Sequence, residues 1–356
     1  MSETSYRKLQ EHLDGLPVGF PKTDSGIEIR ILKKIFTPEE AEMAVKLTMM
    51  PETVEDFSKR TGMDSSEAGE KLEAMAKKGQ IFRMKRGENV YYSAAVFVPG
   101  IWEYQLKNLD RELAELFEEF YADAFEGTLK QSNTQLFRIL PIEENISPEM
   151  DVMPYHQVRD LIRSQRTIAV AECICRKEKR LLGQGCNHLS EVCLLFSHMA
   201  RFYVENDLAR FITVEEALEV LDKAEEDGLV HSPVNTQHIM GLCNCCGCCC
   251  GLLRGITQLN MHPSQVARSD FYCVSDSELC SGCGICLERC PVTAITVDEI
   301  AVVDRERCIG CGLCVSTCPT EAMSLVAKSE GVTTPPPSTS GDMLMQIAVE
   351  RMKGGN

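Results

Sequence analysis

The chain has 356 residues, of which 44% are hydrophobic and 25% are charged, and its formal net charge is −16. This composition is typical of a soluble protein with several domains, and the negative charge argues against general affinity for nucleic acid. We see no apolar run of membrane-spanning length and no signal peptide, so we expect a cytoplasmic protein that does not bind membranes. Nineteen cysteines in the cytoplasm indicate thiolate ligands or free thiols rather than disulfides. So many thiols also suggest an anaerobic cell.

The N-terminal part divides into an arm and a helical region. Residues 1–30 have weak periodicity and early Gly/Pro breaks, so we expect an arm with one short helix. Thr37-Pro38-Glu39-Glu40 marks a helix start, with a capping threonine, a proline at the first helical position and acids in the first turn. The pattern then predicts helices over 37–50, 53–62 and 64–78, and strands over 81–86 and 89–93. Three helices followed by a hairpin resemble a winged-helix domain, which we place at residues 31–98.

Winged-helix domains commonly bind DNA, and their third helix enters the major groove. The charges on this helix therefore indicate whether DNA binding is expected. Here it begins with Asp64, Glu67 and Glu70, whose charges would repel phosphates. The hairpin is basic, but three charges on a hairpin more often form a solvated face. We therefore expect this domain to dock a protein partner or a second copy of the chain, and not to bind nucleic acid.

A long connecting helix is predicted within residues 99–130. Leucines and phenylalanines recur at helical spacing over 101–126, after Trp102 at its start. This apolar face fits either packing inside the chain or a subunit interface.

Residues 131–272 form a cysteine-rich module that we expect to be helical or α+β. The pattern predicts strands over 136–141 and 166–171, a loop over 145–154, and a helix over 155–164. Two further helices are expected over 190–205 and 213–227, and the second opens with the capping box Thr213-Val214-Glu215-Glu216.

Ten cysteines in this module are too many for packing alone and are candidate metal ligands: Cys173, Cys175, Cys186, Cys193, Cys243, Cys245, Cys246, Cys248, Cys249 and Cys250. Soft thiolates favour at least one further [4Fe-4S] cluster. Zinc is the alternative, with four cysteines or three and a histidine such as His188 or His231, and a catalytic cluster with an open iron position is a third reading. The spacing assigns no ligand subset, because adjacent cysteines cannot all turn toward one metal.

Residues 280–319 contain the pattern C-x2-C-x2-C-x3-C-P twice. Three closely spaced thiolates can hold one [4Fe-4S] cluster, and the cysteine before the proline is carried to the cluster of the other copy. One cluster would then be held by Cys280, Cys283, Cys286 and Cys318, and the other by Cys308, Cys311, Cys314 and Cys290. Zinc is the competing interpretation, but two complete copies with Cys-Pro ends argue against it.

These motifs resemble those of bacterial two-[4Fe-4S] ferredoxins, which implies a ferredoxin domain at residues 273–326 with hairpin strands over 294–298 and 300–304. The wider pattern CxCR…CNCCGCCC before such a domain is similar to multidomain 4Fe-4S binding proteins of anaerobes, and it brings no reaction with it. Cys273 stands alone and is expected to be a buried apolar residue. The remaining histidines show no ligand pattern and are expected to be ordinary surface or core residues.

Residues 327–356 change to a Pro- and Ser-rich linker followed by a short amphipathic helix over 342–353, which would dock on the body or on a partner.

The sequence as a whole predicts a multidomain α+β protein: a winged-helix-like domain, a cysteine-rich module and a two-cluster ferredoxin fold. We expect an iron–sulfur electron-transfer protein that serves a redox partner, and we identify no catalytic residue or nucleotide fingerprint. Two alternatives remain open. One is a redox-responsive DNA-binding regulator, and the other is an iron–sulfur enzyme with its active cluster in the middle module.

Overall fold

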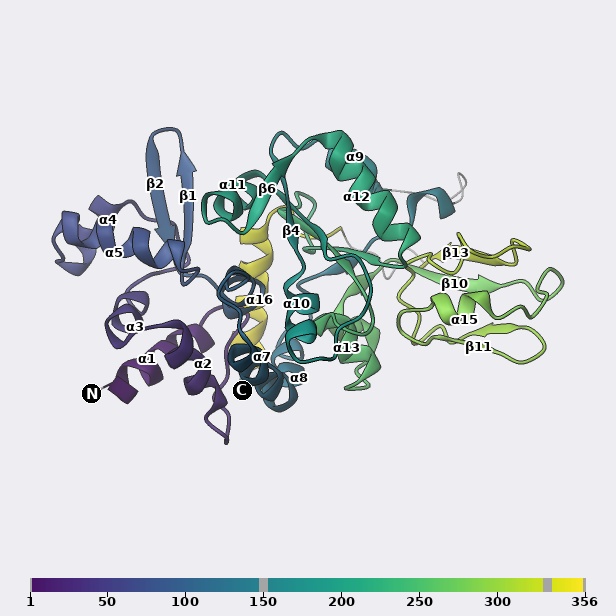
Figure 1. Cartoon of the computed structure of the whole chain (residues 1–356), viewed down its shortest axis with the longest axis horizontal. Helices are drawn as coiled ribbons and strands as arrows, with labels where there is room; N and C mark the ends of the chain where they lie inside the picture. The colour runs from purple at the N-terminus through teal and green to yellow at the C-terminus, as the bar shows by residue number, and fades with distance from the viewer. Residues whose placement is uncertain (1, 147–152, 329–334, 355–356) are drawn as a thin grey trace.

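The computed structural model describes residues 2–146, 153–328 and 335–354, and these residues form three regions along its longest axis (Figure 1). Helices α1–α5 and the hairpin β1–β2 lie at one end, and α15 with strands β10–β13 lies at the other. A five-stranded sheet with its helices occupies the middle. The protein is thus a mixed α/β structure built on small sheets.

The N-terminal region is helical, with a hairpin at its end. Its elements are α1 (Ser2–Asp14), α2 (Ile27–Ile35), α3 (Pro38–Ala44), α4 (Val54–Thr61), α5 (Ser65–Lys77), β1 (Phe82–Arg86) and β2 (Asn89–Ser93). Thr37 caps α3 in a capping box with Glu40, and Thr53 and Asp64 cap the next two helices through their side chains. Residues 1–30 differ from the expected arm, because Leu9 and Leu13 of α1 are buried in the core and α2 crosses residue 30.

The predicted long helix over 101–126 is wrong as a single element. The chain forms α6 (Trp102–Tyr104), a turn, α7 (Arg111–Phe120), a wider helical turn at Tyr121–Phe125 and α8 (Glu126–Leu129). The break occurs because the Asp110 side chain accepts the Leu113 N–H and so starts a new helix. The two pieces pack together, since the Trp102 and Phe117 rings stack with centroids 3.7 Å apart. The apolar face is therefore covered within the chain.

The middle sheet is antiparallel throughout, in the order β6-β4-β5-β8-β7. Its strands are β4 (Ile168–Glu172), β5 (Glu191–Phe196), β6 (Ala209–Ile212), β7 (Val230–Pro233) and β8 (Gly241–Cys245). The helices around it are α9 (Val158–Arg163), α10 (Ile174–Leu181), α11 (Ser197–Glu205), α12 (Val214–Glu226), α13 (Gly251–Thr257) and α14 (Pro263–Val266). The strand expected over 136–141 is reduced to β3 (Arg138–Ile139), which pairs in parallel with β9 (Arg268–Ser269).

The helix expected over 190–205 is wrong in its first half. Residues 191–196 form the strand β5, which lies between β4 and β8, and only the second half is helical. A short apolar run fits a buried strand as well as a buried helix, so periodicity could not separate the two. Ser197, with φ 53°, marks the change of direction. Thr213 does cap α12 in the expected capping box with Glu216. The expected loop over 145–154 falls mostly outside the described residues.

The C-terminal region contains two small antiparallel sheets and one short helix. β10 (Phe271–Ser275) pairs with β13 (Met323–Ala327), β11 (Ile295–Val297) pairs with β12 (Ala301–Val303), and α15 covers Ile285–Arg289.

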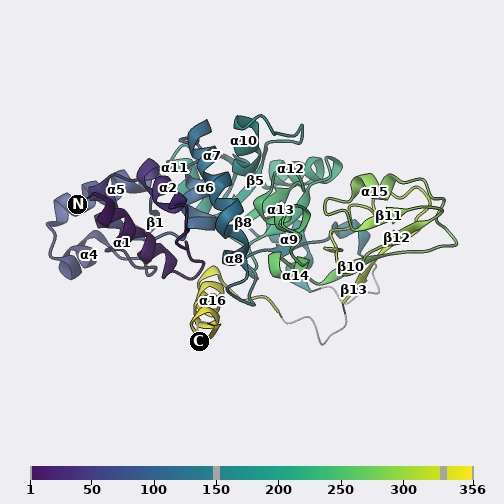
Figure 2. The same cartoon turned by 90° about the horizontal axis from the view of Figure 1, so that it is seen from below.

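The last helix, α16 (Ser340–Gly354), returns to the body of the protein and lies beside α8 at its lower edge (Figure 2). Glu350 there accepts hydrogen bonds from the Thr134 hydroxyl and backbone N–H, both at 2.8 Å. Among the described residues, no helix combines the length and apolar character needed to cross a bilayer.

Candidate metal centres

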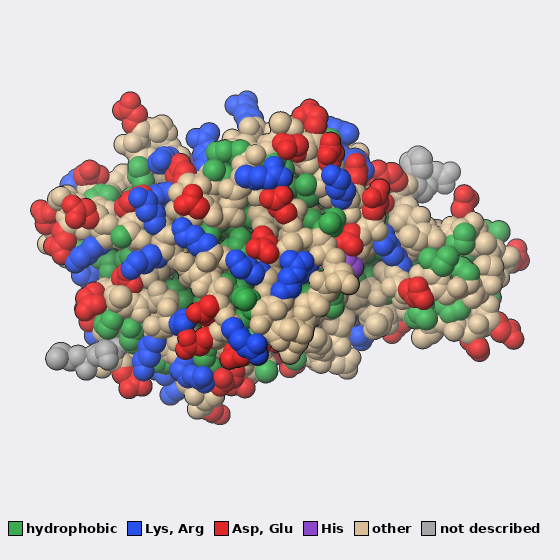
Figure 3. All heavy atoms as spheres, in the orientation of Figure 1, with side chains coloured by type: hydrophobic (Ala, Val, Ile, Leu, Met, Phe, Trp, Pro, Cys, Tyr) green, Lys and Arg blue, Asp and Glu red, His purple; other side chains and the backbone are tan. Residues whose placement is uncertain are grey.

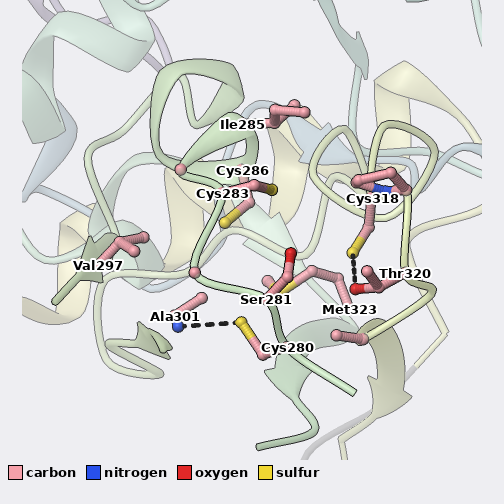
Figure 4. A pocket seen from close by; sticks show the side chains of 14 residues that line it. Cys280, Ser281, Cys283, Ile285, Cys286, Val297, Ala301, Cys318, Thr320 and Met323 are labelled. Atoms are coloured by element: carbon pink, nitrogen blue, oxygen red, sulfur yellow. Dashed lines mark hydrogen bonds between the residues drawn. The ribbon is translucent and has the colours of Figure 1, made fainter. Parts of the chain in front are cut away.

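The first of the C-terminal cavities gathers the four thiols assigned to one cluster. Cys280, Cys283 and Cys286 come from the loop before α15 and its first turn, while Cys318 comes from the second motif (Figure 4). Apolar side chains, including Val297 and Met323, complete the lining. The arrangement fits a [4Fe-4S] cluster, because four thiols from two motifs surround one apolar space.

Polar groups of the β11–β12 hairpin and of the second motif lie close to the sulfurs of this cavity. The Ala301 N–H donates to Cys280 Sγ at 3.3 Å, and Thr320 Oγ1 lies 3.7 Å from Cys318 Sγ (Figure 4). The Ala301 N–H is the main reason that the pKa of Cys280 is lowered. Backbone donors of this kind stabilise thiolates and the clusters bound to them.

Glycine is required where the loop passes close to other backbone. Gly282 has φ +68°, and a Cβ there would lie 2.4 Å from the Glu299 carbonyl oxygen. Gly310, its counterpart in the second motif, has φ +64°, and a Cβ there would lie 2.2 Å from the Phe271 oxygen. The first loop thus lies against the turn between β11 and β12, and the second against β10, in each case through a residue without a side chain.

The second cavity gathers the other four thiols. It is lined by Cys308, Cys311 and Cys314 from the second motif, and by Cys290 from the first. The Ala294 N–H donates to Cys290 Sγ at 3.2 Å, and the Cys273 N–H donates to Cys308 Sγ at 3.3 Å. Burial raises the pKa of Cys290, Cys308 and Cys311. Cys311 and Cys314 are buried, whereas Cys283 of the first cavity is exposed, so the second cavity is the more enclosed of the two. Its chemistry also fits a [4Fe-4S] cluster.

Cys273 has a closer relation to the second cavity than its isolation in the sequence suggests. It is 1% exposed, as expected for a buried residue, but it also lines this cavity. The Cys314 thiol donates to Cys273 Sγ at 3.5 Å. Its place opposite the second motif follows from the pairing of β10 with β13, which local spacing does not reveal.

Six of the ten middle cysteines lie at the same end of the strands of the five-stranded sheet. Cys173 follows β4, Cys193 lies in β5, Cys243 and Cys245 lie in β8, and Cys175 and Cys250 lie at the starts of α10 and α13. Antiparallel pairing places the end of β4, the start of β5 and the end of β8 at the same end of the sheet. We call these residues the six-thiol ring: Cys173, Cys175, Cys193, Cys243, Cys245 and Cys250.

The thiols of this ring interact with their neighbours in a closed cycle. The pKa of Cys173 is lowered by the thiols of Cys175 and Cys193, and the pKa of Cys243 by those of Cys193 and Cys245. The pKa of Cys250 is lowered by the thiols of Cys175 and Cys245, and each of the donor thiols has its own pKa raised in return. The ring thus offers more soft ligands than the four that one [4Fe-4S] cluster uses.

The remaining four middle cysteines form a separate and tighter group. Their sulfurs all lie within 4.8 Å of one another, and we call them the four-thiol group: Cys186, Cys246, Cys248 and Cys249. Cys186 comes from the loop between α10 and β5, and the others come from the turn between β8 and α13. The candidate ligands therefore divide into two sets.

Arg176 lies between the two sets and is 1% exposed. Its guanidinium donates to the Asn244 carbonyl oxygen at 3.1 Å and to Cys246 Sγ at 3.6 Å. Burial by itself lowers the pKa of Arg176. The neighbouring Cys173 and Cys246 thiolates raise this pKa by more than burial lowers it, so the net shift is upward. The motif contains this arginine, but only the fold reveals that it compensates thiolate charge.

The histidines considered as zinc ligands lie outside both sets. His188 Nδ1 is 3.0 Å from Asp227 Oδ1, and His231 Nδ1 is 2.7 Å from Asn244 Oδ1. In the part of the chain that the structure describes, the close group of candidate metal ligands therefore consists of cysteines and contains no histidine.

Comparison with known families shows a match to the 4Fe-4S binding domain family (Fer4) over residues 274–296 and 301–324. Each matched segment contains one copy of the cysteine motif. The match implies at least one [4Fe-4S] cluster in this region and an iron–sulfur electron-transfer function. No curated protein and no solved structure matches the chain.

Proposed function

We propose that this protein carries single electrons through two [4Fe-4S] clusters in its C-terminal region and at least one further cluster in the six-thiol ring, in exchange with a redox partner. The observation that supports this most is the composition of the two C-terminal cavities. Each has three thiols from its own motif and a fourth from the other, Cys318 in one cavity and Cys290 in the other. This is the ligand exchange that two-cluster ferredoxins use.

The residues around these cavities suit reversible electron transfer. Bound [4Fe-4S] clusters exchange single electrons at potentials that depend on hydrogen bonding and solvent exposure. The N–H groups of Ala301, Ala294 and Cys273 point at ligand sulfurs, which stabilises negative charge there. Buried neighbours such as Val292 and Leu313 limit access of water to the second cavity.

Close packing between the middle module and residues that line the second cavity supports a continuous route for electrons. Gly247 lies between Cys246 and Cys248, and a Cβ there would be 1.9 Å from the Pro291 carbonyl oxygen, next to Cys290. One apolar cluster also contains Cys245 and Cys250 of the six-thiol ring together with Cys311 of the second cavity. The second cavity therefore lies on the side of the middle module, and the first lies farther out.

The surface beside the outer cavity suits a protein partner. Leu279, Ile285 and Leu287 are 51%, 42% and 43% exposed, and hydrophobic and acidic side chains occur together at that end of the molecule (Figure 3). Glu278 and Glu288 are exposed there as well. An apolar patch with acidic neighbours fits a redox partner that presents an apolar surface with basic residues around it.

The hairpin of the N-terminal region has contacts that favour internal packing over DNA binding. Arg83 is 4% exposed and pairs with Glu73 and with Glu205 of α11, while Lys85 also pairs with Glu205. Two of the three basic residues are thus neutralised within the chain, and the start of α5 is acidic. We propose the winged-helix-like region as a protein-docking element.

The proposal is tested by reductive titration with electron paramagnetic resonance on the full chain, purified without oxygen. We expect signals from two C-terminal clusters and uptake of about one electron by each. Cys318→Ser should alter the signal of the outer cluster alone, while the matched variant Cys273→Ser should keep both. Unchanged signals in Cys318→Ser would contradict the ligand exchange.

A further inference from the structure

The four-thiol group has the dimensions of a site for one metal ion. Cys186 Sγ lies 4.0 Å from Cys246 Sγ and 3.5 Å from Cys249 Sγ, and Cys248 Sγ lies 3.8 Å from Cys249 Sγ. Four sulfurs bound tetrahedrally to one zinc at about 2.3 Å would be roughly 3.8 Å apart. The three observed separations scatter around that value.

A [4Fe-4S] cluster requires more room. Its irons and sulfides lie between the ligands and hold the cysteine sulfurs roughly 6 Å apart. The four-thiol group, with all sulfurs within 4.8 Å of one another, is too small for such a cluster without rearrangement.

The other cysteines of the chain provide an internal comparison. Among the described residues, no other set of three or more Cys, His, Asp or Glu ligand atoms lies this close together. The thiols of the two C-terminal cavities and of the six-thiol ring are therefore spread more widely. The difference within one molecule separates the four-thiol group from the sites that fit clusters.

The surroundings also fit a tetrathiolate ion site. Four thiolates and one divalent ion carry a net negative charge, and the buried Arg176 guanidinium donates to Cys246 Sγ at 3.6 Å. Cys246 and Cys249 are 2% and 1% exposed, whereas Cys248 is exposed and gives a path for metal entry. Soft sulfur ligands in tetrahedral geometry select zinc or iron among the common divalent ions.

We infer that Cys186, Cys246, Cys248 and Cys249 bind one tetrahedral zinc or iron ion, as a centre distinct from the iron–sulfur clusters. The ion fastens the loop before β5 to the turn between β8 and α13. That turn carries Gly247, which packs against Pro291 of the first C-terminal motif. The site thus holds in place the surface where the middle module meets the C-terminal region. The inference goes beyond the proposed electron transfer and does not depend on it.

The test compares Cys186→Ser and Cys248→Ser with the matched variant Cys193→Ser, which changes the six-thiol ring. Zinc, iron and acid-labile sulfide are measured per chain on full-length protein purified without oxygen. The two four-thiol variants should lose one metal ion while their sulfide content is unchanged. Cys193→Ser should instead lower iron and sulfide together and keep the single ion. Loss of iron and sulfide in equal amounts from the four-thiol variants, or no loss of metal at all, would overturn the inference.

A measurement on the unmutated chain covers the case in which the variants do not fold. X-ray absorption at the zinc edge should show four sulfur neighbours at about 2.3 Å and no second metal nearby. If zinc is absent, iron should exceed sulfide by one per chain, which identifies the ion as iron. Absence of zinc together with equal iron and sulfide rules the site out. The paramagnetic signals of the C-terminal clusters are read in the same sample, so failure of this inference is distinguished from failure of the electron-transfer proposal.

Discussion

At the scale of single residues, glycines shape the loops that carry the C-terminal thiols. Gly282 and Gly284 both have positive φ, +68° and +79°, but only Gly282 has a close neighbour, since a Cβ at this residue would lie 2.4 Å from the Glu299 oxygen. The two residues therefore separate the cost of backbone conformation from the cost of a steric clash.

We predict that Gly282→Ala destabilises the fold by more than about 2 kcal/mol and lowers iron content, because the loop must move away from Glu299. Gly284→Ala, with nothing within 4 Å of its Cβ, should cost only about 1 kcal/mol. Denaturant unfolding and iron analysis on both variants check this. Equal losses in the two would show that the close approach at Gly282 is unimportant.

Glu178 gives a prediction about pH. It is 2% exposed, and burial together with the neighbouring Glu118 carboxylate raises its pKa. A carboxyl group whose folded-state pKa is raised contributes stability that is fully present below its unfolded pKa of about 4.3 and is lost as the pH rises toward the folded value. The wild-type protein thus loses this contribution across the neutral range.

Glu178→Gln should become more stable relative to wild type as the pH rises, because glutamine can still donate to Glu118 and cannot ionise. Thermal unfolding at about pH 5 and about pH 8 measures the difference. A difference between variant and wild type that does not change with pH would contradict the raised pKa.

The sequence predicts the arrangement of the C-terminal cysteines better than that of the middle cysteines. The exchange of Cys290 and Cys318 between the two motifs is implied by spacing, and the structure brings each of them to the cavity of the other motif. The division of the middle cysteines into six and four could not be predicted. Cys245 and Cys246 are neighbours in sequence but join different sets, because the strand β8 ends between them.

At the scale of elements, a cluster of ion pairs joins α7 to α10 and α13. Glu118 accepts hydrogen bonds from both Nη atoms of Arg254 at 2.6 and 2.7 Å, and from Lys179 Nζ at 2.6 Å. Lys179 lies in α10 and Arg254 in α13, and their side chains are 4% and 5% exposed. The contact therefore fixes α7 against the helices that position Cys175 and Cys250.

We predict that Glu118→Ala destabilises the protein by roughly 3–5 kcal/mol, because it removes the carboxylate that pairs with two buried cations. Glu119 is the matched control. It pairs with Arg30 on the surface, where the two side chains are 42% and 56% exposed, so Glu119→Ala should cost less than about 1 kcal/mol. Denaturant unfolding of both variants measures the costs, and similar values would refute the assignment.

Elements with local end signals were predictable from sequence. Thr37, Thr53, Asp64 and Thr213 each cap a helix that begins where the sequence indicates. The errors occur where tertiary contacts decide. Residues 191–196 become a strand because β4 and β8 pair with them on both sides. Asp110 starts a new helix, although the helical spacing of apolar residues continues across this position.

At the scale of the whole molecule, the candidate centres follow one another from the six-thiol ring to the second cavity and then to the first. The order follows from packing between regions that are distant in sequence, such as Gly247 against Pro291. Local spacing predicts the 4Fe-4S binding region at the C-terminus and candidate metal ligands in the middle of the chain, but not where these two regions lie relative to one another. The outer cavity at the end of the chain of centres is the one closest to exposed apolar surface.

The count of iron and acid-labile sulfide per chain, on full-length protein purified without oxygen, tests this account most directly. Three [4Fe-4S] clusters predict at least about twelve of each, with the ion of the four-thiol group in addition. About eight of each would contradict a cluster in the six-thiol ring and leave the C-terminal region as the only redox centre. Fewer than about eight would contradict the two-cluster assignment itself.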